Sequence, residues 1–149
     1  MSQSTSHVIY AELTCMCSDE RSAIAFLQEQ GVLHRERTCS CGTPMVLSTT
    51  DGRASRWRCN KKACKKELSF RTGTWLEGTK APAHIVIWFI YLWVHGKTSI
   101  KELKRELHMN HKATVEWNLA MREVMADTLM RNRVTVGGPC LTVQVDETV

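Results

Sequence analysis

The chain has 149 residues, of which 43% are hydrophobic and 23% charged, and it carries a formal net charge of +5 at pH 7. This composition is typical of a soluble protein with one domain or two small ones. The longest apolar run, residues 85–94, is too short to span a bilayer, so we expect no membrane partner.

The N-terminal residues indicate an intracellular protein. The start of the chain lacks the basic and apolar regions of a secretory signal, so we expect the protein to stay inside the cell, where cysteines are reduced. If the host is eukaryotic, we expect residence in the nucleus. Residues 1–35 are predicted to form a helical segment. Residues 8–11 favour a short strand or no regular structure, and a helix is predicted from Ser18, which can cap it while Asp19 and Glu20 occupy the first turn.

Residues 36–72 are predicted to form a zinc ribbon. Two close cysteine pairs flank two short apolar runs, and Asp51-Gly52 between the runs is a strong signal for a tight hairpin turn. We expect strands at about residues 45–48, 55–59 and 67–71, and the hairpin carries both cysteine pairs to one end of the sheet. Four thiolates at one point suit a structural, tetrahedral Zn²⁺, with the ligands Cys39, Cys41, Cys59 and Cys64.

Alternatives to this ligand set stay open. The first cysteine pair has a single spacer residue, one fewer than usual, so His34 is a substitute ligand if one cysteine of that pair does not reach the ion. Buried or free cysteines are the competing interpretation, and disulfides are disfavoured in a reducing compartment. The remaining cysteines, Cys15, Cys17 and Cys140, are interpreted as spare thiols.

Basic residues crowd the second half of the predicted ribbon, where only Glu67 opposes them. Such clustering costs electrostatic self-repulsion that a bound polyanion relieves, so the pattern favours contact with DNA phosphates over a merely solvated basic face. The residues predicted to bind DNA here are Arg56, Arg58, Lys61, Lys62, Lys65 and Lys66.

Residues 73–133 are predicted to form a three-helix bundle. The helices are expected over about residues 82–95, 100–107 and 111–131. Thr79 and Asn110 are the predicted N-caps of the first and third, and Thr98 and Ser99 are expected to start the second. A tight turn between the last two helices is typical of a helix-turn-helix, whose final helix enters the major groove by its N-terminal end. The predicted groove-facing residues are His111, Lys112, Thr114 and Asn118. Any three-helix bundle gives a similar pattern, which is the competing interpretation.

Residues 134–149 are predicted to form the first strands of a further domain. Leu141, Val143 and Val145 alternate as in a strand, and Asp146 follows them. A carboxylate at the end of a strand occurs in nucleases and transferases that use two magnesium ions. Taken alone, the Asp146 position is explained more simply by a solvated chain end.

The order and spacing of these motifs resemble the front half of Merlin-type DNA transposases and their bacterial insertion-sequence relatives. The resemblance covers about residues 20–149. It is carried by residues 26–32, Cys41-Gly42, Met45, Asp51-Gly52, residues 57–59, Cys64, residues 69–73, residues 91–93, residues 137–139 and residues 145–147. It implies an α+β chain with a zinc ribbon, a helix-turn-helix and an RNase H-like catalytic domain that binds divalent metal through three acidic residues. Asp146 is similar to the first of these three.

The chain ends three residues after Asp146, so the catalytic domain that the resemblance implies is incomplete. One carboxylate does not hold two metal ions, so Mg²⁺ and DNA cleavage are expected only if the gene product continues. As the chain stands, we expect a DNA-binding protein rather than an enzyme. This protein is expected to recognise duplex DNA at transposon ends, and a homo-oligomer is compatible with that function. The alternatives are the truncated front of an active transposase and a zinc-stabilised protein-interaction module.

Overall fold

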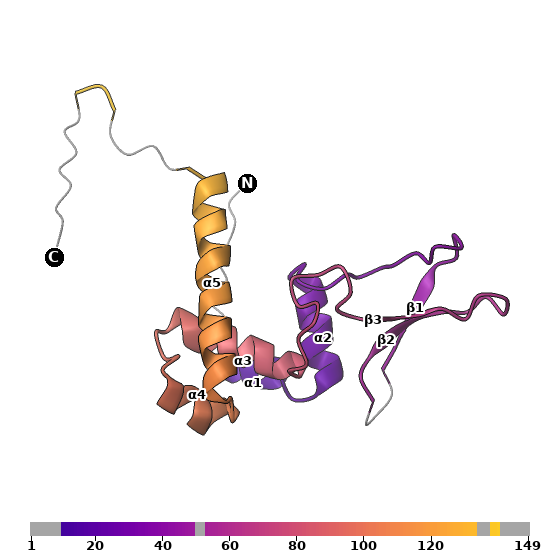
Figure 1. The fold of residues 1–149 in the computed structure, drawn as a ribbon, viewed down its shortest axis with the longest axis horizontal. Helices are drawn as coiled ribbons and strands as arrows, with labels where there is room; N and C mark the ends of the chain where they lie inside the picture. Colours follow the sequence, from indigo (N-terminus) through magenta and orange to yellow (C-terminus); the bar gives the residue numbers. More distant parts are fainter. Residues whose placement is uncertain (1–9, 50–52, 134–137, 141–149) are drawn as a thin grey trace. The chain divides into compact units, whose positions relative to one another are not determined.

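The protein combines helices with a small sheet, and the structure, a computed structural model, describes residues 10–49, 53–133 and 138–140. Over these residues the fold is α+β, with a three-stranded antiparallel sheet that follows the second helix along the chain (Figure 1). The elements are α1 Tyr10–Met16, α2 Glu20–Glu29, β1 Met45–Ser48, β2 Arg56–Cys59, β3 Glu67–Ser69, α3 Ala83–Val94, α4 Ile100–Leu107 and α5 His111–Arg131. None of these helices is long and apolar enough to cross a membrane.

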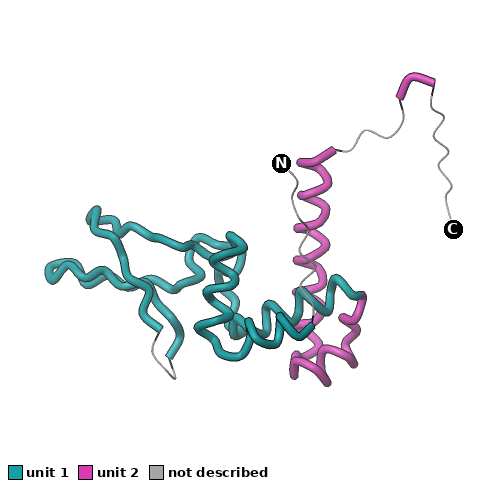
Figure 2. The backbone as a smooth tube through the Cα atoms, turned by 180° about the vertical axis from the view of Figure 1, so that it is seen from behind, with its two compact units in different colours: residues 1–95 teal, residues 96–149 magenta. Residues whose placement is uncertain are grey.

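The chain divides into two compact units (Figure 2). Unit 1, residues 1–95, contains α1, α2, the sheet and α3, and unit 2, residues 96–149, contains α4 and α5. The predicted terminal strands over residues 134–149 lie outside the described residues, apart from a turn at residues 139–140.

Helix α1 corrects the expectation of a strand or irregular segment at its start. It has seven residues and buries only Leu13. A segment of seven residues is too short for its sequence to display a helical period. A tertiary contact supports it: the Tyr10 ring lies 5.4 Å from that of Trp88 on α3, measured between centroids. The cap of α2 also differs by one residue, because Asp19 rather than Ser18 accepts a 2.8 Å hydrogen bond from the Ser22 amide.

The sheet has the strand order β1-β2-β3, with Met45 opposite Cys59 and Arg58 opposite Glu67. Alternation along β2 buries Trp57 and Cys59 and exposes Arg56 and Arg58, as a period of two requires. The three strands predicted from the sequence are present, although β3 ends earlier than expected. The Asp51-Gly52 turn lies outside the described residues.

The start of α3 is capped from a distant part of unit 1. The Ala83 amide donates to both carboxylate oxygens of Glu20, at 2.7 and 2.9 Å. A carboxylate at this point satisfies an orphan amide and the positive end of the helix dipole. Thr79 was expected to be this cap, and that prediction is wrong: its hydroxyl donates to the Leu76 carbonyl and accepts from Arg71.

Unit 2 confirms the predicted bounds of its two helices. Ser99 and Glu102 form a reciprocal capping box at the start of α4, and the Asn110 side chain accepts a 2.8 Å hydrogen bond from the Ala113 amide at the start of α5. Between the helices, His108 adopts a left-handed conformation with φ of 53°. Leu129, which helical spacing from Ala113 and Trp117 predicts on the buried side of α5, is instead 65% exposed.

Candidate metal centre

Four cysteine sulfurs meet at one end of the sheet. The Sγ atoms of Cys39, Cys41, Cys59 and Cys64 all lie within 4.8 Å of one another. Cys39 Sγ is 3.6 Å from Cys64 Sγ, and Cys41 Sγ is 3.6 Å from Cys59 Sγ. Tetrahedral zinc with Zn–S bonds of about 2.3 Å holds its sulfurs about 3.8 Å apart, so the cluster has the dimensions of such a site. The four predicted ligands are therefore brought together.

The first cysteine pair reaches the cluster through a tight turn. The Gly42 amide donates to the Cys39 carbonyl at 2.9 Å, and the Cys39 amide donates to the Thr43 carbonyl at 2.9 Å. Gly42 has φ of +80°, a conformation that glycine adopts without steric cost. This glycine explains how a pair with a single spacer residue still directs both sulfurs to one point.

The second pair is arranged by the end of β2 and the loop that follows. The Cys59 amide donates to the Lys66 carbonyl and the Cys64 amide to the Lys61 carbonyl, both at 2.9 Å. Lys65 then takes a left-handed conformation, with φ of 49°, to bring the chain back toward β3. The sulfurs thus sit on two turns held by main-chain hydrogen bonds.

Each sulfur also receives a main-chain hydrogen bond from the residue two positions further along. The amides of Cys41, Thr43, Lys61 and Lys66 serve the sulfurs of Cys39, Cys41, Cys59 and Cys64, respectively, and each of them lowers the pKa of its thiol. Four amides directed at four sulfurs favour thiolates, which are the form that binds a metal.

The four thiols nevertheless do not ionise alike. The hydrogen bond between the Cys41 sulfur and the Thr43 hydroxyl, and then the Thr43 amide, lower the pKa of Cys41 to about 6. At Cys59 the amide of Lys61 has the largest single effect, but burial and the neighbouring sulfurs outweigh it and raise the pKa to about 11. Crowded anions repel one another, so full ionisation of this cluster calls for a bound cation.

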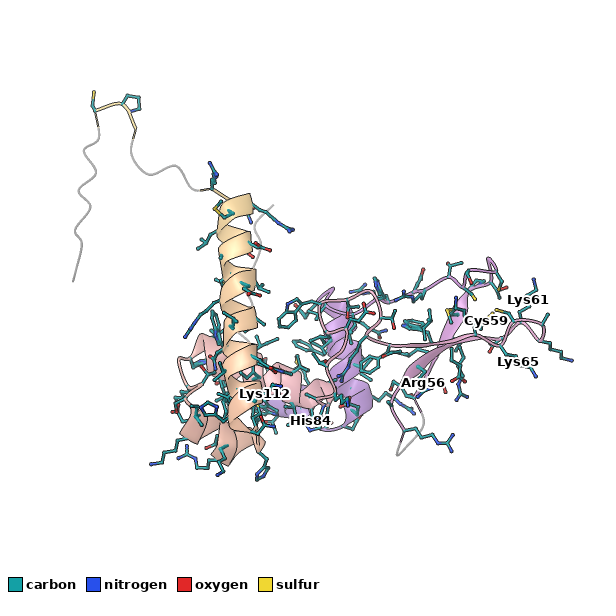
Figure 3. All side chains as sticks on the ribbon, viewed as in Figure 1. Arg56, Cys59, Lys61, Lys65, His84 and Lys112 are labelled. Carbon is teal, nitrogen blue, oxygen red and sulfur yellow. The ribbon has the colours of Figure 1, made fainter. Side chains whose placement is uncertain are left out.

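The four predicted lysines lie at this end of the sheet, where Figure 3 shows Lys61 and Lys65 close to Cys59. Lys61, Lys62, Lys65 and Lys66 are all exposed. Lys66 Nζ donates to the Ser40 hydroxyl at 3.3 Å, whereas the other three lysines have no side-chain partner among the described residues. Zn²⁺ with four thiolates carries a formal charge of about −2, so four lysines more than neutralise such a centre.

Arg56 and Arg58 lie on the exposed face of β2 and share one carboxylate. Arg58 Nε is 2.9 Å from Glu67 Oε1, and Arg56 Nη1 is 3.4 Å from Glu67 Oε2. One carboxylate opposite two guanidinium groups leaves a net positive charge on this face.

The predicted groove residues of α5 divide into two pairs. His111 and Lys112 are exposed at the start of the helix. Thr114 is only 2% exposed, and its hydroxyl donates to the Asn110 carbonyl, which corrects the expectation that it faces DNA. Asn118 is half-buried, accepts a hydrogen bond from the Thr98 hydroxyl at 2.8 Å and donates to the Thr114 carbonyl at 2.9 Å.

The other candidate residues lie away from the cluster. His34 places Nε2 3.2 Å from the Gly73 carbonyl oxygen and is not grouped with the four sulfurs. Cys15, Cys17 and Cys140 are free and likewise outside the group, and burial raises the pKa of Cys17. Asp146 lies outside the described residues. Sequence reasoning missed the roles of Glu20 and Arg71, for which the sequence offers no local signal.

Comparisons with known proteins give no independent information on the function of this site. Protein-family models, curated proteins and solved structures gave no match to the chain. The function therefore has to be inferred from the chemistry of the site.

Proposed function

We propose that this chain is a zinc-stabilised module that binds duplex DNA, with phosphate contacts made by the lysines around the cysteine cluster. The observation that carries the proposal is that these lysines are exposed on the turn that holds Cys59 and Cys64 in the cluster. Bound Zn²⁺ would be held by Cys39, Cys41, Cys59 and Cys64 and would fix the loop from which the lysines project.

The metal has a structural role in this proposal. All four ligand positions are occupied by cysteine, and a tetrahedral site with four protein ligands leaves no position for a substrate. The strands of the sheet have four, four and three residues, too few for a stable sheet without further support. Structural zinc contributes about 10–16 kcal/mol to the folding of small domains, which is sufficient to order this one.

The charge of the loop supports a polyanionic partner. Lys61, Lys62 and Lys65 have no counter-ion among the described residues, and the two arginines of β2 share one glutamate. Such unpaired lysines contact phosphates independently of base sequence, and their binding releases counterions from the duplex. In unit 2, exposed His111 and Lys112 at the start of α5 are the residues we propose for base contacts.

The similarity to the front half of Merlin-type transposases is consistent with this function, and transposon ends are the duplex we propose as its target. Cleavage and strand transfer stay predictions that depend on Asp146 and on residues beyond this sequence. A protein-interaction module is the rival reading, and it requires no contribution of the lysines to DNA retention.

The experiment is a salt titration of duplex binding by the zinc-loaded chain. We expect affinity to fall steeply between about 50 and 200 mM salt, with a log–log slope of about −0.9 for each phosphate contacted. Replacing Lys61, Lys62 and Lys65 by glutamine should weaken binding and flatten this slope. The matched control replaces Lys97, Lys101 and Lys104, three exposed lysines of unit 2, by glutamine. No binding at low salt, or equal losses in both variants, would overturn the proposal.

A further inference from the structure

A second candidate site lies in unit 1, at the end of the sheet away from the cysteines. It is an open cleft of about 900 Å³. Register places this end unambiguously, because Arg56 pairs with Ser48 while Cys59 pairs with Met45 at the opposite end. Figure 3 shows the same separation, with Arg56 and Cys59 at opposite ends of the sheet. The cleft is formed by the start of α2, the ends of the strands and the segment that leads into α3.

Four basic side chains line this cleft. Arg21, Arg53 and Lys80 are exposed along it, and none of them has a hydrogen-bond or ion-pair partner among the described residues. The fourth, Arg71, is only 7% exposed. The cleft therefore presents three unpaired cations in front of one buried cation.

The two carboxylates that line the cleft are already engaged. Asp19 caps α2 through the Ser22 amide, and its Oδ2 also accepts a 2.8 Å hydrogen bond from the Ser22 hydroxyl. Glu20 caps α3 through the Ala83 amide, and its Oε2 lies 3.1 Å from His84 Nδ1. Four cations therefore face two acids whose oxygens serve helix ends, which leaves a net positive charge in the cleft.

Arg71 is the fixed part of the site. Its Nη1 donates to the Thr79 carbonyl at 2.6 Å and to the Thr79 hydroxyl at 2.8 Å, and its Nη2 donates to the Ala81 carbonyl. Its Nε is buried and has no partner among the described residues. Burial lowers the pKa of Arg71 and the charge of Glu20 partly offsets this, but an arginine keeps its proton in a protein. A buried cation bonded only to neutral oxygens is costly, and an anion in front of it offsets that cost.

We propose that this cleft binds a backbone phosphate of the DNA duplex, with Arg53 and Lys80 as direct contacts and Arg71 as the charge behind them. The inference rests on the proposed function and adds a second anchor, distinct from the lysines around the cysteines. A guanidinium and an ammonium group that line the same open cleft match the delocalised charge of a phosphodiester. The openness of the cleft suits a phosphate that belongs to a long polymer.

The first arm of the test follows the cleft directly. The ¹⁵N–¹H resonance of Arg71 Nε is recorded in the zinc-loaded chain during additions of a short duplex and, separately, of inorganic phosphate at matched ionic strength. We expect the duplex to shift this resonance in a saturable way. A shift with inorganic phosphate alone would identify a small-anion site and overturn the DNA assignment, and so would no shift with either.

The second arm measures the salt dependence of duplex binding by the double variant Arg53→Ala, Lys80→Ala. We expect the slope to fall in magnitude by about 0.9, the value for one lost phosphate contact. The control, Lys97→Ala with Lys104→Ala, removes the same charge from unit 2 and should leave the slope unchanged. Equal zinc content and circular dichroism in all three proteins show that folding is preserved.

The two proposals fail in distinguishable ways. If the unmodified chain binds no duplex at low salt, the proposed function fails and takes this assignment with it. If the unmodified chain binds but the cleft variant keeps the slope of the control, the cleft assignment is overturned while the proposed function stands.

Discussion

Replacing Cys59 by serine tests the metal centre most sharply among single substitutions. Cys59 is the last residue of β2, lies opposite Met45, and places its sulfur 3.6 Å from that of Cys41. The hydroxyl of serine is a poor zinc ligand, so the substitution leaves three thiolates and a mismatched fourth position.

The expected loss follows from the share of one ligand. If four ligands together contribute about 10–16 kcal/mol of zinc binding, removing one costs roughly 3 kcal/mol or more. A small domain has only about 5–15 kcal/mol of stability in total. We therefore expect Cys59→Ser to lose zinc and to unfold the sheet, while helices α1, α2 and α3 retain part of their helical signal.

The assay combines zinc per chain, measured by elemental analysis, with the ¹⁵N–¹H spectrum of the tryptophan side chains. Trp57 precedes Cys59 on β2 by two residues and is 3% exposed, so its indole resonance reports the packing of the sheet. Cys15→Ser is the matched control, because Cys15 is exposed and outside the cluster. A variant that keeps one zinc ion and an unchanged thermal transition would refute the ligand assignment.

Three further substitutions test the supports of the two units. Glu20→Ala removes the cap of α3 and should cost about 1–2 kcal/mol in urea unfolding, whereas Glu29→Ala on the same helix should cost almost nothing; equal effects would refute the cap. Hydrogen bonds from the Ser99 side chain and amide lower the pKa of Glu102 in the folded chain. Ionised Glu102 therefore stabilises unit 2 fully above the ordinary glutamate pKa, and this stabilisation is lost as the pH falls through the lowered pKa of the folded state. Glu102→Gln should flatten the acid limb of stability against pH, and an unchanged limb would contradict the capping box. Asn118→Ala should destabilise unit 2 by about 1–3 kcal/mol, and a loss of DNA affinity without loss of stability would restore its predicted role in the groove.

Local signals in the sequence predicted much of this fold. The first two strands of the sheet follow from two short apolar runs on either side of Asp51-Gly52, and the bounds of α4 and α5 follow from Ser99 and Asn110, whose side chains cap them in the structure. The cysteine cluster was also predictable, because a hairpin determines where its two ends meet. In each case the determining contacts lie within a few residues or across one pair of strands.

Long-range contacts account for what the sequence did not reveal. Glu20 caps a helix that begins 63 residues later, and no local pattern indicates such a pair. The buried side of α5 was misjudged at Thr114 and Leu129 because apolar residues occur on every side of that helix, so its period does not select one face. The cleft around Arg71 depends on three segments that only the folded chain brings together.

X-ray absorption at the zinc edge tests the central claim most directly. The account predicts one zinc ion per chain, surrounded by four sulfur atoms at about 2.3 Å. A chain that folds without zinc, or a zinc ion bound by nitrogen or oxygen in place of these sulfurs, would contradict it.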